Sequence, residues 1–399
     1  MVNSGARNEK AGHSQGQQRK ARAALCMLKT NIHDHTVFRI RLDELRILVE
    51  TLGMEVVGEF VQIEPRPFPR FFIGKGKVEE IGGFVKGHDV DVVVMYNIIK
   101  SSQKLNLIRA FHCDVVDRYE VILEIFDKNA SDNVSRLQIE AARLQKLTPY
   151  FKLATAERFR HDRPFFLSMG EYAYHSQLRE LTSRKAKLRE QIEALKMEKR
   201  QQIRKRRSLG FPLVCIAGYY NAGKTRLFNA LTGDSKLVTP LPFTTLSSKY
   251  QRRYVDAETT LLFIDTIGFV IDLDPRLIQS FELNLEDMRS ADLVLLVLEI
   301  DDPVMKLRIK LLEGIRLLND IGIPREKIII VFNKIDLAPK LAGTIGETLE
   351  MEHLEIPWTI VSAKDRTNLD GLIGLIIGRL RQLRESPKIE EKAAIVESS

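Results

Sequence analysis

The stretch "LVCIAGYYNAGKTRLFNALTG", residues 213–233, decides the fold of the carboxyl-terminal half of the chain. Its first five residues form an apolar run typical of a buried strand, and its last eight have the pattern of a helix. Between them, residues 218–225 fit G-x-x-x-x-G-K-[ST], a loop that surrounds nucleotide phosphates with backbone N–H groups. Lys224 adds a positive charge, and the Thr225 hydroxyl can ligate Mg²⁺. The residues predicted to contact a nucleotide here are Gly218, Tyr219, Tyr220, Asn221, Ala222, Gly223, Lys224, Thr225 and Arg226.

A second motif, Asp265-Thr266-Ile267-Gly268, follows the apolar run 261–264. In phosphate-loop enzymes an acidic residue after such a strand holds Mg²⁺, and the glycine N–H bonds the γ-phosphate. We predict these roles for Asp265 and Gly268. Phe269 comes next, where a water-orienting glutamine often sits, and a benzyl group cannot orient water. We therefore predict slow basal turnover that a partner raises, and a place for Phe269 in the core is compatible with this.

A third motif selects the base. Asn333-Lys334-Ile335-Asp336 ends the apolar run "KIIIVF", at the sheet edge where ligands bind. A carboxylate only accepts hydrogen bonds, so Asp336 suits the N1–H and N2–H₂ donors of guanine, whereas adenine presents a lone pair at N1. Asn333 is predicted to bridge base and loop, and the Lys334 stem to cover the ring. Further on, Ser362-Ala363-Lys364 can offer backbone N–H groups to the guanine O6.

Between the phosphate loop and Asp265 lies "TPLPFTTLSSKYQRR", residues 239–253. A γ-phosphate switch needs a threonine that meets Mg²⁺ in a loop that reorders on hydrolysis. We assign this role to Thr245, with Thr244 in reserve and Phe243 beside them as a further nucleotide contact. Lys224, Thr245 and Gly268 are the predicted catalytic residues.

Asn221 in the phosphate loop has two interpretations. Its side chain can tie the loop down by hydrogen bonds, or it can help to hold a potassium ion between loop and phosphates. The first interpretation is favoured, and the second stays open.

The rest of the 399-residue chain is read from its patterns. Apolar β-rich runs alternate with helical patterns from about residue 23 to 128, which predicts a small α/β layer domain with a largely parallel sheet. Two long helical stretches that can zip together follow. The predicted units are a tail, an α/β domain, an antiparallel helical hairpin, a phosphate-loop domain and a second tail, at residues 1–22, 23–132, 133–208, 209–384 and 385–399.

Composition excludes several classes of protein. With 44% hydrophobic and 29% charged residues the chain is globular, and it contains no apolar run long enough for a membrane span. The amino end lacks the apolar middle of a secretion signal, so we expect a cytoplasmic protein. Cys26, Cys113 and Cys215 are widely spaced and are predicted to be core thiols.

A net charge of +8 suits a polyanionic partner, and residues 184–207 hold the densest group of basic side chains. We interpret this stretch as the electrostatic footprint for such a partner. The connection between the two long helices, "HDRPFFLSMGE" at 161–171, contains Pro164 and Gly170 beside apolar residues. Two interpretations have even odds: a hydrophobic plug folded onto the helices, or a tip that contacts a partner.

With five motifs in order, the chain resembles the HflX family of translation-factor-class GTPases. The residues that carry the resemblance are "GYYNAGKT", "PFTTL", "DTIGFVIDLDPRLIQSF", "ADLVLLVLEID", "NKID" and "SAK", and in the amino-terminal part "FFIGKGKVEEI" and "VVDRYEVILEIFDKNASDNVSRLQIEAARLQKL". The resemblance covers about residues 24–384. It implies an α/β architecture in which an amino-terminal α/β domain with a long helical hairpin precedes a Ras-like phosphate-loop GTPase domain, whose mixed, mostly parallel sheet carries helices on both faces.

The resemblance also implies a monomeric GTPase that uses Mg²⁺ and associates with the large ribosomal subunit and its RNA. The family has been linked to ATP binding by its amino domain. Here Gly74-Lys75-Gly76 is the nearest match to a phosphate cradle, and a helix-starting turn is favoured by about four to one because the third glycine of a dinucleotide fingerprint is missing. Many relatives have a glycine-rich tip between the long helices, whereas this chain keeps only Gly170-Glu171 of it. Ribosome binding is therefore implied, and ribosome splitting is not.

Two alternatives to a ribosome-associated GTPase stay open. The first is a GTP-dependent switch that acts on a protein partner through its helical hairpin. The second is an RNA remodeller with an additional, ATP-binding site in the amino domain. The guanine-type Asp336 argues against the latter.

Overall fold

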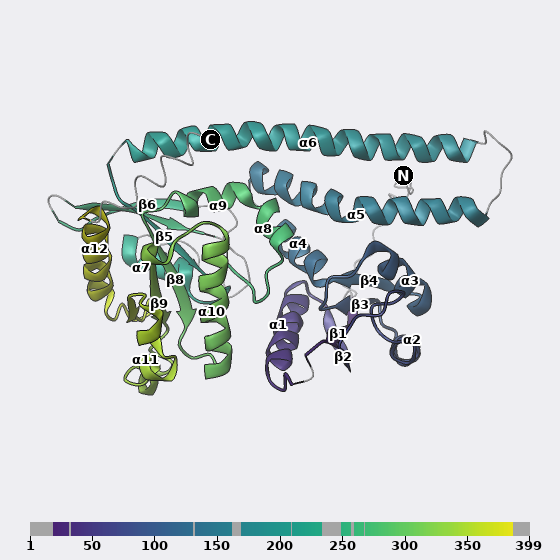
Figure 1. Ribbon diagram of the computed structural model, residues 1–399, viewed down its shortest axis with the longest axis horizontal. Helices are drawn as coiled ribbons and strands as arrows, with labels where there is room; N and C mark the ends of the chain where they lie inside the picture. Colours follow the sequence, from purple (N-terminus) through teal and green to yellow (C-terminus); the bar gives the residue numbers. More distant parts are fainter. Residues whose placement is uncertain are drawn as a thin grey trace, which may run out of the picture.

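The computed structural model describes residues 19–31, 33–130, 132–161, 169–208, 210–233, 249–256, 259–266 and 268–385. Figure 1 shows two α/β bodies side by side beneath a pair of long helices. Within the described residues, no helix is both long enough and apolar enough to cross a membrane. The α/β fold class predicted from the sequence is confirmed.

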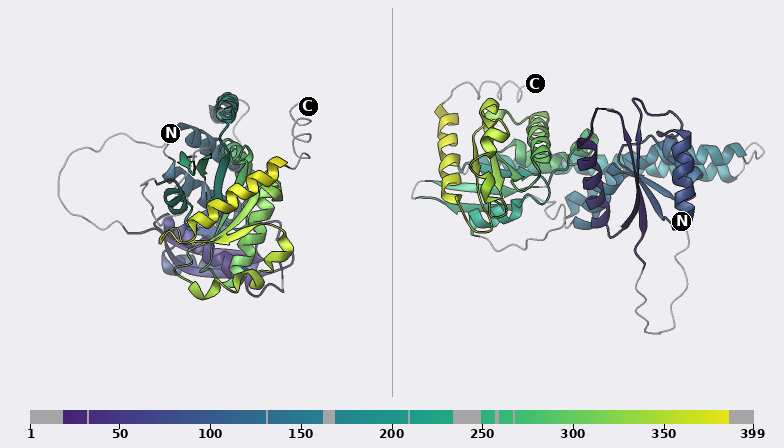
Figure 2. Two further views of the ribbon diagram at one scale, coloured as in Figure 1. Left: turned by 90° about the vertical axis from the view of Figure 1, so that its left-hand side faces the viewer. Right: turned by 90° about the horizontal axis from the view of Figure 1, so that it is seen from below.

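The first body is a four-stranded sheet in the order β2-β1-β3-β4, and every neighbouring pair is parallel. Side chains of β1 alternate between two apolar clusters, so both faces of the sheet are buried. Helices α1 and α4 cover one face, and α2 and α3 cover the other (Figure 2). The elements are β1 (Arg22–Lys29), α1 (Val37–Thr51), β2 (Glu55–Ile63), α2 (Lys75–His88), β3 (Val92–Met95), α3 (Ser101–Phe111), β4 (Asp114–Asp117) and α4 (Arg118–Asn129).

The hairpin consists of α5 (Asn133–His161) and α6 (Met169–Arg207), which lie side by side; α6 extends over both bodies, and α5 lies over the first body (Figure 1). Leu188 is buried, and Leu181, Ile192 and Leu195 are half-buried, as the three- and four-residue spacing predicts. The connecting tip, 162–168, lies outside the described residues, so the choice between plug and partner contact stays open.

The second body is a six-stranded sheet in the order β10-β9-β8-β5-β7-β6. Among the described strands, β6 and β7 pair antiparallel, and the other neighbouring pairs are parallel. Helices α7 and α12 pack on one face, and α9 and α10 on the other. The strands are β5 (Leu213–Gly218), β6 (Lys249–Tyr254), β7 (Thr260–Asp265), β8 (Leu293–Glu299), β9 (Ile328–Asn333) and β10 (Trp358–Ile360). The helices are α7 (Lys224–Thr232), α8 (Pro275–Ser280), α9 (Glu282–Arg289), α10 (Val304–Asp320), α11 (Ile345–Thr348) and α12 (Leu369–Glu385), with short 3₁₀ turns at Arg325–Lys327, Pro339–Leu341 and Met351–Leu354.

The two bodies share an apolar cluster. Tyr220 of the phosphate loop, together with Val270, Leu277 and Phe281, belongs to the same buried cluster as the side chains of α1 and α4. The rings of Phe126 and Phe281 meet edge to face with centroids 4.6 Å apart. The segment that follows Gly268 is therefore packed between the bodies.

The predicted domain boundaries at 132/133 and 208/209 fall between α4 and α5 and between α6 and β5. This division into domains remains a proposal.

Among the cysteines, Cys26 and Cys215 are buried as predicted, and burial raises the pKa of the Cys26 thiol to about 12. Cys113 is only partly buried, because it lies in the turn before β4 rather than within a strand.

Candidate active site

The phosphate loop joins the end of β5 to the start of α7. Gly218 has φ +136°, and a Cβ on it would lie 2.2 Å from the Val297 carbonyl oxygen, so only glycine fits. Gly223 has φ +82°, and a Cβ there would lie 2.4 Å from Nδ2 of Asn333. The two glycines let the loop pass close to β8 and β9, which places the start of α7 at the sheet edge where ligands bind.

The side chains expected at the phosphates lie together. Nζ of Lys224 is buried and donates to the Tyr219 carbonyl at 2.7 Å, across the base of the loop. Burial lowers the pKa of Lys224 to about 8, partly offset by Asp265 and Glu299. The charge of this amine is therefore stabilised when an anion approaches it.

Thr225 and Asp265 form the candidate Mg²⁺ site. The Thr225 hydroxyl donates to Oδ2 of Asp265 at 2.9 Å, and Asp265 is fully buried at the end of β7. Two oxygen donors from a loop and a strand fit Mg²⁺, which takes one or two protein ligands and completes its shell with phosphates and water. Among the described residues, no group of three or more His, Cys, Asp or Glu could hold a metal.

Gly268 and Phe269 lie directly against the phosphate loop. The Phe269 N–H donates to the Gly218 carbonyl at 2.9 Å, and the Tyr220 N–H donates to the Phe269 carbonyl at 3.0 Å. A Cβ on Gly268 would lie 3.1 Å from Nζ of Lys224, so glycine keeps the approach to the amine open. Two backbone hydrogen bonds thus fasten this segment to the phosphate loop.

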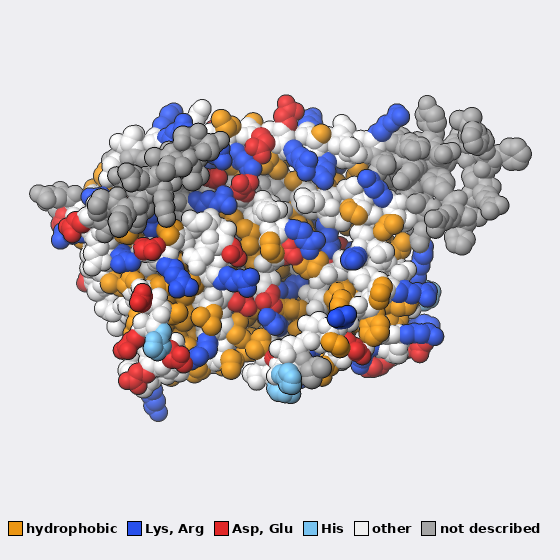
Figure 3. Space-filling view, viewed as in Figure 1, with side chains coloured by type: hydrophobic (Ala, Val, Ile, Leu, Met, Phe, Trp, Pro, Cys, Tyr) orange, Lys and Arg blue, Asp and Glu red, His pale blue; other side chains and the backbone are white. Residues whose placement is uncertain are grey.

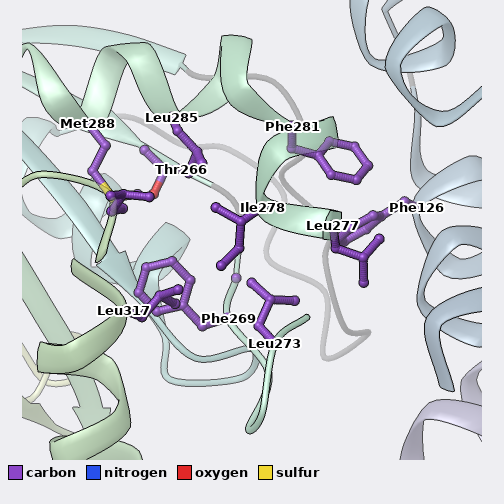
Figure 4. A pocket seen from close by; sticks show the side chains of 12 residues that line it. Phe126, Thr266, Phe269, Leu273, Leu277, Ile278, Phe281, Leu285, Met288 and Leu317 are labelled. Atoms are coloured by element: carbon purple, nitrogen blue, oxygen red, sulfur yellow. The ribbon is translucent and has the colours of Figure 1, made fainter. Parts of the chain in front are cut away.

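The Phe269 side chain lies in the core, near Leu317 and Leu273 (Figure 4). It is 3% exposed, and its ring meets that of Tyr219 edge to face at 6.1 Å. It borders an apolar cavity of about 30 Å³, room for one water, with Leu273, Ile278 and Leu317 around it. The core role considered for Phe269 is confirmed, and its ring cannot align a water molecule.

The base motif lies at the ends of β9 and β10. Asn333 is buried and bridges two segments: its Nδ2 donates to the Ala222 carbonyl at 2.9 Å, and its Oδ1 accepts from the Ala363 N–H at 3.0 Å. The Ser362 hydroxyl donates to Oδ1 of Asp336 at 2.7 Å, which orients the carboxylate. Nζ of Lys364 is 3.7 Å from the other oxygen. The backbone N–H of Ala363, one of the groups predicted to reach the guanine O6, thus donates to Asn333 in this structure.

The remaining predicted residues are placed as follows. Thr266 is buried and its hydroxyl donates to the Ile216 carbonyl at 2.8 Å, so it fastens β7 to β5. Asn221 has φ +62° and is exposed, as is Arg226 in the first turn of α7. Tyr219 and Tyr220 turn their rings into the core, which leaves their backbones toward the phosphates. Phe243, Thr244, Thr245 and Ile267 lie outside the described residues.

Comparisons with known proteins agree with this site. A family model described as "GTP-binding GTPase N-terminal" matches residues 39–127, and one described as "50S ribosome-binding GTPase" matches residues 213–334. GTPase HflX of Thermofilum pendens is 35% identical over 339 residues, which are 85% of this chain and 80% of the relative. GTPase HflX of Thermococcus kodakarensis is 33% identical over 351 residues, 87% of this chain and 77% of the relative.

The chain belongs to the HflX family of GTPases. The resemblance drawn from the motifs is therefore confirmed, and the protein binds and hydrolyses GTP. Among solved structures, a crystal structure of SsGBP in complex with GDP covers 91% of this chain and 99% of its own, with 24% identity and a TM-score of 0.49. GTPases of this class use Mg²⁺, and in this HflX protein Thr225 and Asp265 are the residues that fit it.

Several side chains that contact the site of this HflX protein were not predicted from the sequence. Glu44 of α1 and Arg118 of α4 contact the backbone just after Phe269, and Glu299 of β8 contacts the phosphate loop. The signal for Glu299 is a charged residue that ends the otherwise apolar run 293–298. Glu44 and Arg118 carry no comparable signal, since acidic and basic residues in amphipathic helices are usually exposed.

Proposed function

We propose that this protein associates with the large ribosomal subunit and its RNA, and that it hydrolyses GTP slowly until this partner stimulates it. The identity of the partner rests on the family, one of whose models is described as a ribosome-binding GTPase. The observation that carries the proposal is the contact between the amino-terminal body and the segment 270–274. This segment follows Phe269 and is the part of a GTPase that responds to the γ-phosphate.

Residues 271 and 272 are fixed from both sides by buried charges. Oε1 of Glu44 accepts from the Ile271 N–H at 3.0 Å, and Arg118 donates to the Ile271 carbonyl and, at 3.1 Å, to the Asp272 carbonyl. Glu44 and Arg118 pair at 3.0 Å and are 2% and 4% exposed. Charge-assisted bonds this deeply buried are strong. The amino-terminal body therefore holds the segment in one position.

Further contacts extend this grip to the Asp272 carboxylate. The Tyr96 hydroxyl donates to Oδ2 of Asp272 at 2.7 Å, and Nε of Arg41 lies 2.7 Å from the same oxygen. The Asp272 N–H donates to Glu313 of α10 at 3.0 Å. We name the side chains of Glu44, Arg118, Tyr96 and Arg41 the switch clamp. A partner that moves the amino-terminal body would release the clamp and free the segment to rearrange around the γ-phosphate.

The basic stretch of α6 divides into two sets. Lys196, Lys199 and Arg200 pair with acidic side chains of α9, namely Glu282, Asp287 and Glu286. Lys196 and Lys199 are half-buried and fasten the hairpin to the GTPase body, so the footprint predicted over 184–207 is reduced, whereas Arg200 stays exposed. The other described basic side chains of this stretch that are exposed are Arg184, Lys187, Arg189, Arg204 and Lys205, and Arg184 pairs with Glu140 of α5. Figure 3 shows basic side chains along the hairpin with acidic ones between them.

We propose the following roles at the active site. Lys224 and the loop N–H groups bind the phosphates, Thr225, Asp265 and Thr245 hold Mg²⁺, and Gly268 bonds the γ-phosphate. When bound, Mg²⁺ neutralises charge on the β- and γ-phosphates. Asp336 accepts from guanine, with Lys334 and the 362–364 turn around the ring. Phe243 and Thr244 are proposed as further nucleotide contacts beside Thr245. We also propose that the protein acts as a monomer in the cytoplasm.

Asn221 is proposed as a candidate potassium ligand beside the phosphates, where a cation would stabilise charge that develops in the transition state. Its exposure at the loop edge supports this role. GTP hydrolysis is then expected to be several-fold faster in K⁺ than in Na⁺ buffer of equal ionic strength, a difference of about 1 kcal/mol. Equal rates in the two buffers would exclude potassium as a cofactor.

Co-sedimentation tests the ribosome proposal. Purified protein is centrifuged with large ribosomal subunits in GDP, in GTP and in a non-hydrolysable analogue, and GTP turnover is measured with and without subunits. We expect nucleotide-dependent binding and faster turnover with subunits. If neither the sedimentation of the protein nor its GTP turnover changes with subunits or nucleotide, the proposal is contradicted. GTP-dependent binding of another protein, without binding to subunits, would favour a regulatory switch.

A matched pair of charge reversals sharpens this test. Arg204→Glu changes an exposed cation and is expected to weaken subunit binding about tenfold at low salt, with less effect at high salt. Lys340→Glu on the GTPase body reverses an exposed cation in the same sense and serves as control. Equal effects of the two reversals would show that the hairpin has no special part in binding.

The amino-terminal body supports a helix-starting turn rather than a second nucleotide site. Helix α2 begins at Lys75, directly after Gly74, whose N–H donates to Oε1 of Gln62 at 2.9 Å. Lys75 and Lys77 lie beside Glu79 and Glu80 of their own helix. The cations of this turn are thus partly neutralised within α2.

A further inference from the structure

A buried carboxylate joins the phosphate loop to the base motif. Glu299 is the last residue of β8 and is 7% exposed. Its Oε2 accepts from Nζ of Lys334 at 2.7 Å and from Nδ2 of Asn221 at 3.4 Å. Lys334 belongs to the base motif and Asn221 to the phosphate loop. One oxygen atom therefore contacts both halves of the nucleotide site.

The charge of Glu299 is balanced from behind by Lys310 of α10. Nζ of Lys310 donates to Oε1 of Glu299 at 3.2 Å and also to Asp302, and it lies 5.5 Å from the centroid of the Tyr219 ring. Lys310 is 2% exposed, so this cation is almost wholly enclosed. A buried charge is tolerated only when it is paired, and here the pairing fixes the position of the Glu299 carboxylate.

The contacts constrain what Asn221 and Lys334 can do. An Asn carboxamide that donates through Nδ2 to Glu299 presents its Oδ1 in the same plane, on the opposite side of the Cβ–Cγ bond axis, as an acceptor away from the carboxylate. Asn221 has φ +62°, a conformation that Asn adopts readily and that leaves its side chain at the loop edge. Lys334 has φ +69°, and the bond to Glu299 holds its stem along the side of the base motif.

We propose that Glu299, backed by Lys310, is a positioning residue of the GTPase site. It orients the Asn221 carboxamide toward the phosphates and the Lys334 stem toward the base, so that base recognition and phosphate binding are coupled through one carboxylate. Asn333 forms a parallel link, since its Nδ2 donates to Ala222 of the same loop. The inference rests on the guanine-nucleotide site proposed above and does not depend on the ribosome.

The test compares two neutralising substitutions that share Lys310 as neighbour. Glu299→Gln keeps the side-chain shape and removes the charge that faces Asn221 and Lys334. Asp302→Asn also removes a carboxylate from Lys310, but Asp302 contacts Lys306 and Lys310 and belongs to no nucleotide motif. Binding of a fluorescent GDP analogue, kcat and KM for GTP, and the thermal midpoint are measured for both variants and for the wild type.

We expect Glu299→Gln to weaken GDP binding and to lower kcat/KM by about tenfold, the effect of one charge-assisted hydrogen bond. Asp302→Asn should lower the thermal midpoint about as much as Glu299→Gln does, while its GDP affinity stays within about twofold of the wild type. A double-mutant cycle with Asn221→Ala adds a readout of positioning: the effects on kcat should be less than additive, because both changes remove the same orientation.

Equal kinetic behaviour of Glu299→Gln and Asp302→Asn would overturn the proposal, as would full additivity with Asn221→Ala. If Glu299→Gln fails to fold, the double variant Glu299→Gln/Lys310→Met removes both charges and gives the same comparison with Asp302→Asn. Failure of the wild type itself to bind GDP would instead refute the nucleotide site, which keeps the two conclusions distinct.

Discussion

Asp336→Asn is expected to lower the affinity for GTP at least about a hundredfold, because the two guanine donors then meet a side chain that offers one acceptor and one donor. The same change should raise the affinity for xanthosine triphosphate. Xanthine carries a carbonyl at C2, to which the new amide donates. Ser362 donates to Oδ1 of Asp336 at 2.7 Å, and an Asn oxygen can accept the same bond, so the site keeps its shape.

Competition binding with GTP, ATP and xanthosine triphosphate measures this change of specificity. Asp370→Asn is the matched control, since Asp370 undergoes the same substitution on α12 while its side chain is fully exposed. We expect its base preference to equal that of the wild type. Unchanged GTP affinity in Asp336→Asn would show that another group reads the base, and the assignment of Asn333 to Asp336 as the base motif would fail.

The phosphate loop and the base motif could be predicted because their constraints are local. Gly218 and Gly223 are required by backbone conformation and close approach, and Lys224 and Thr225 follow them at fixed spacing. Asp265 and Asn333 each end an apolar strand, so the parallel sheet brings them to one edge. The mostly parallel sheet with helices on both faces follows from the alternation of strands and helices, whereas the order of the strands was not predicted.

Contacts between distant segments could not be predicted in this way. Glu44 and Ile271 are 227 positions apart, and nothing in the pattern of α1 marks Glu44 as buried. The basic run of α6 was interpreted as an electrostatic footprint for a polyanionic partner, yet Lys199 pairs with Asp287, which is 1% exposed, on α9. Charge counts along one helix cannot show which charges are neutralised by another element, because this depends on how the bodies pack.

Arg118→Met is expected to destabilise the protein by about 3–5 kcal/mol, since it leaves the carboxylate of Glu44 buried without its cation. Burial already raises the pKa of Glu44, against the opposing effect of Arg118. Loss of Arg118 removes that opposition, so the folded variant should hold a proton that the unfolded chain releases. Its stability should then fall further as the pH rises above the ordinary pKa of glutamate. Urea unfolding at pH 6 and pH 8 measures both effects.

The double variant Glu44→Gln/Arg118→Met separates stability from regulation. Without either charge, most of the lost stability should return, because a neutral pair costs little to bury. The glutamine side chain introduced at position 44 still accepts from the Ile271 N–H, but the two backbone bonds from Arg118 are gone, so the segment after Phe269 is held less firmly. Release of about 1–2 kcal/mol of restraint would raise basal GTP turnover by roughly five- to thirtyfold. A stable double variant with wild-type turnover would mean that the switch clamp serves only to join the two bodies, and that slow hydrolysis arises within the GTPase body, from Phe269 alone.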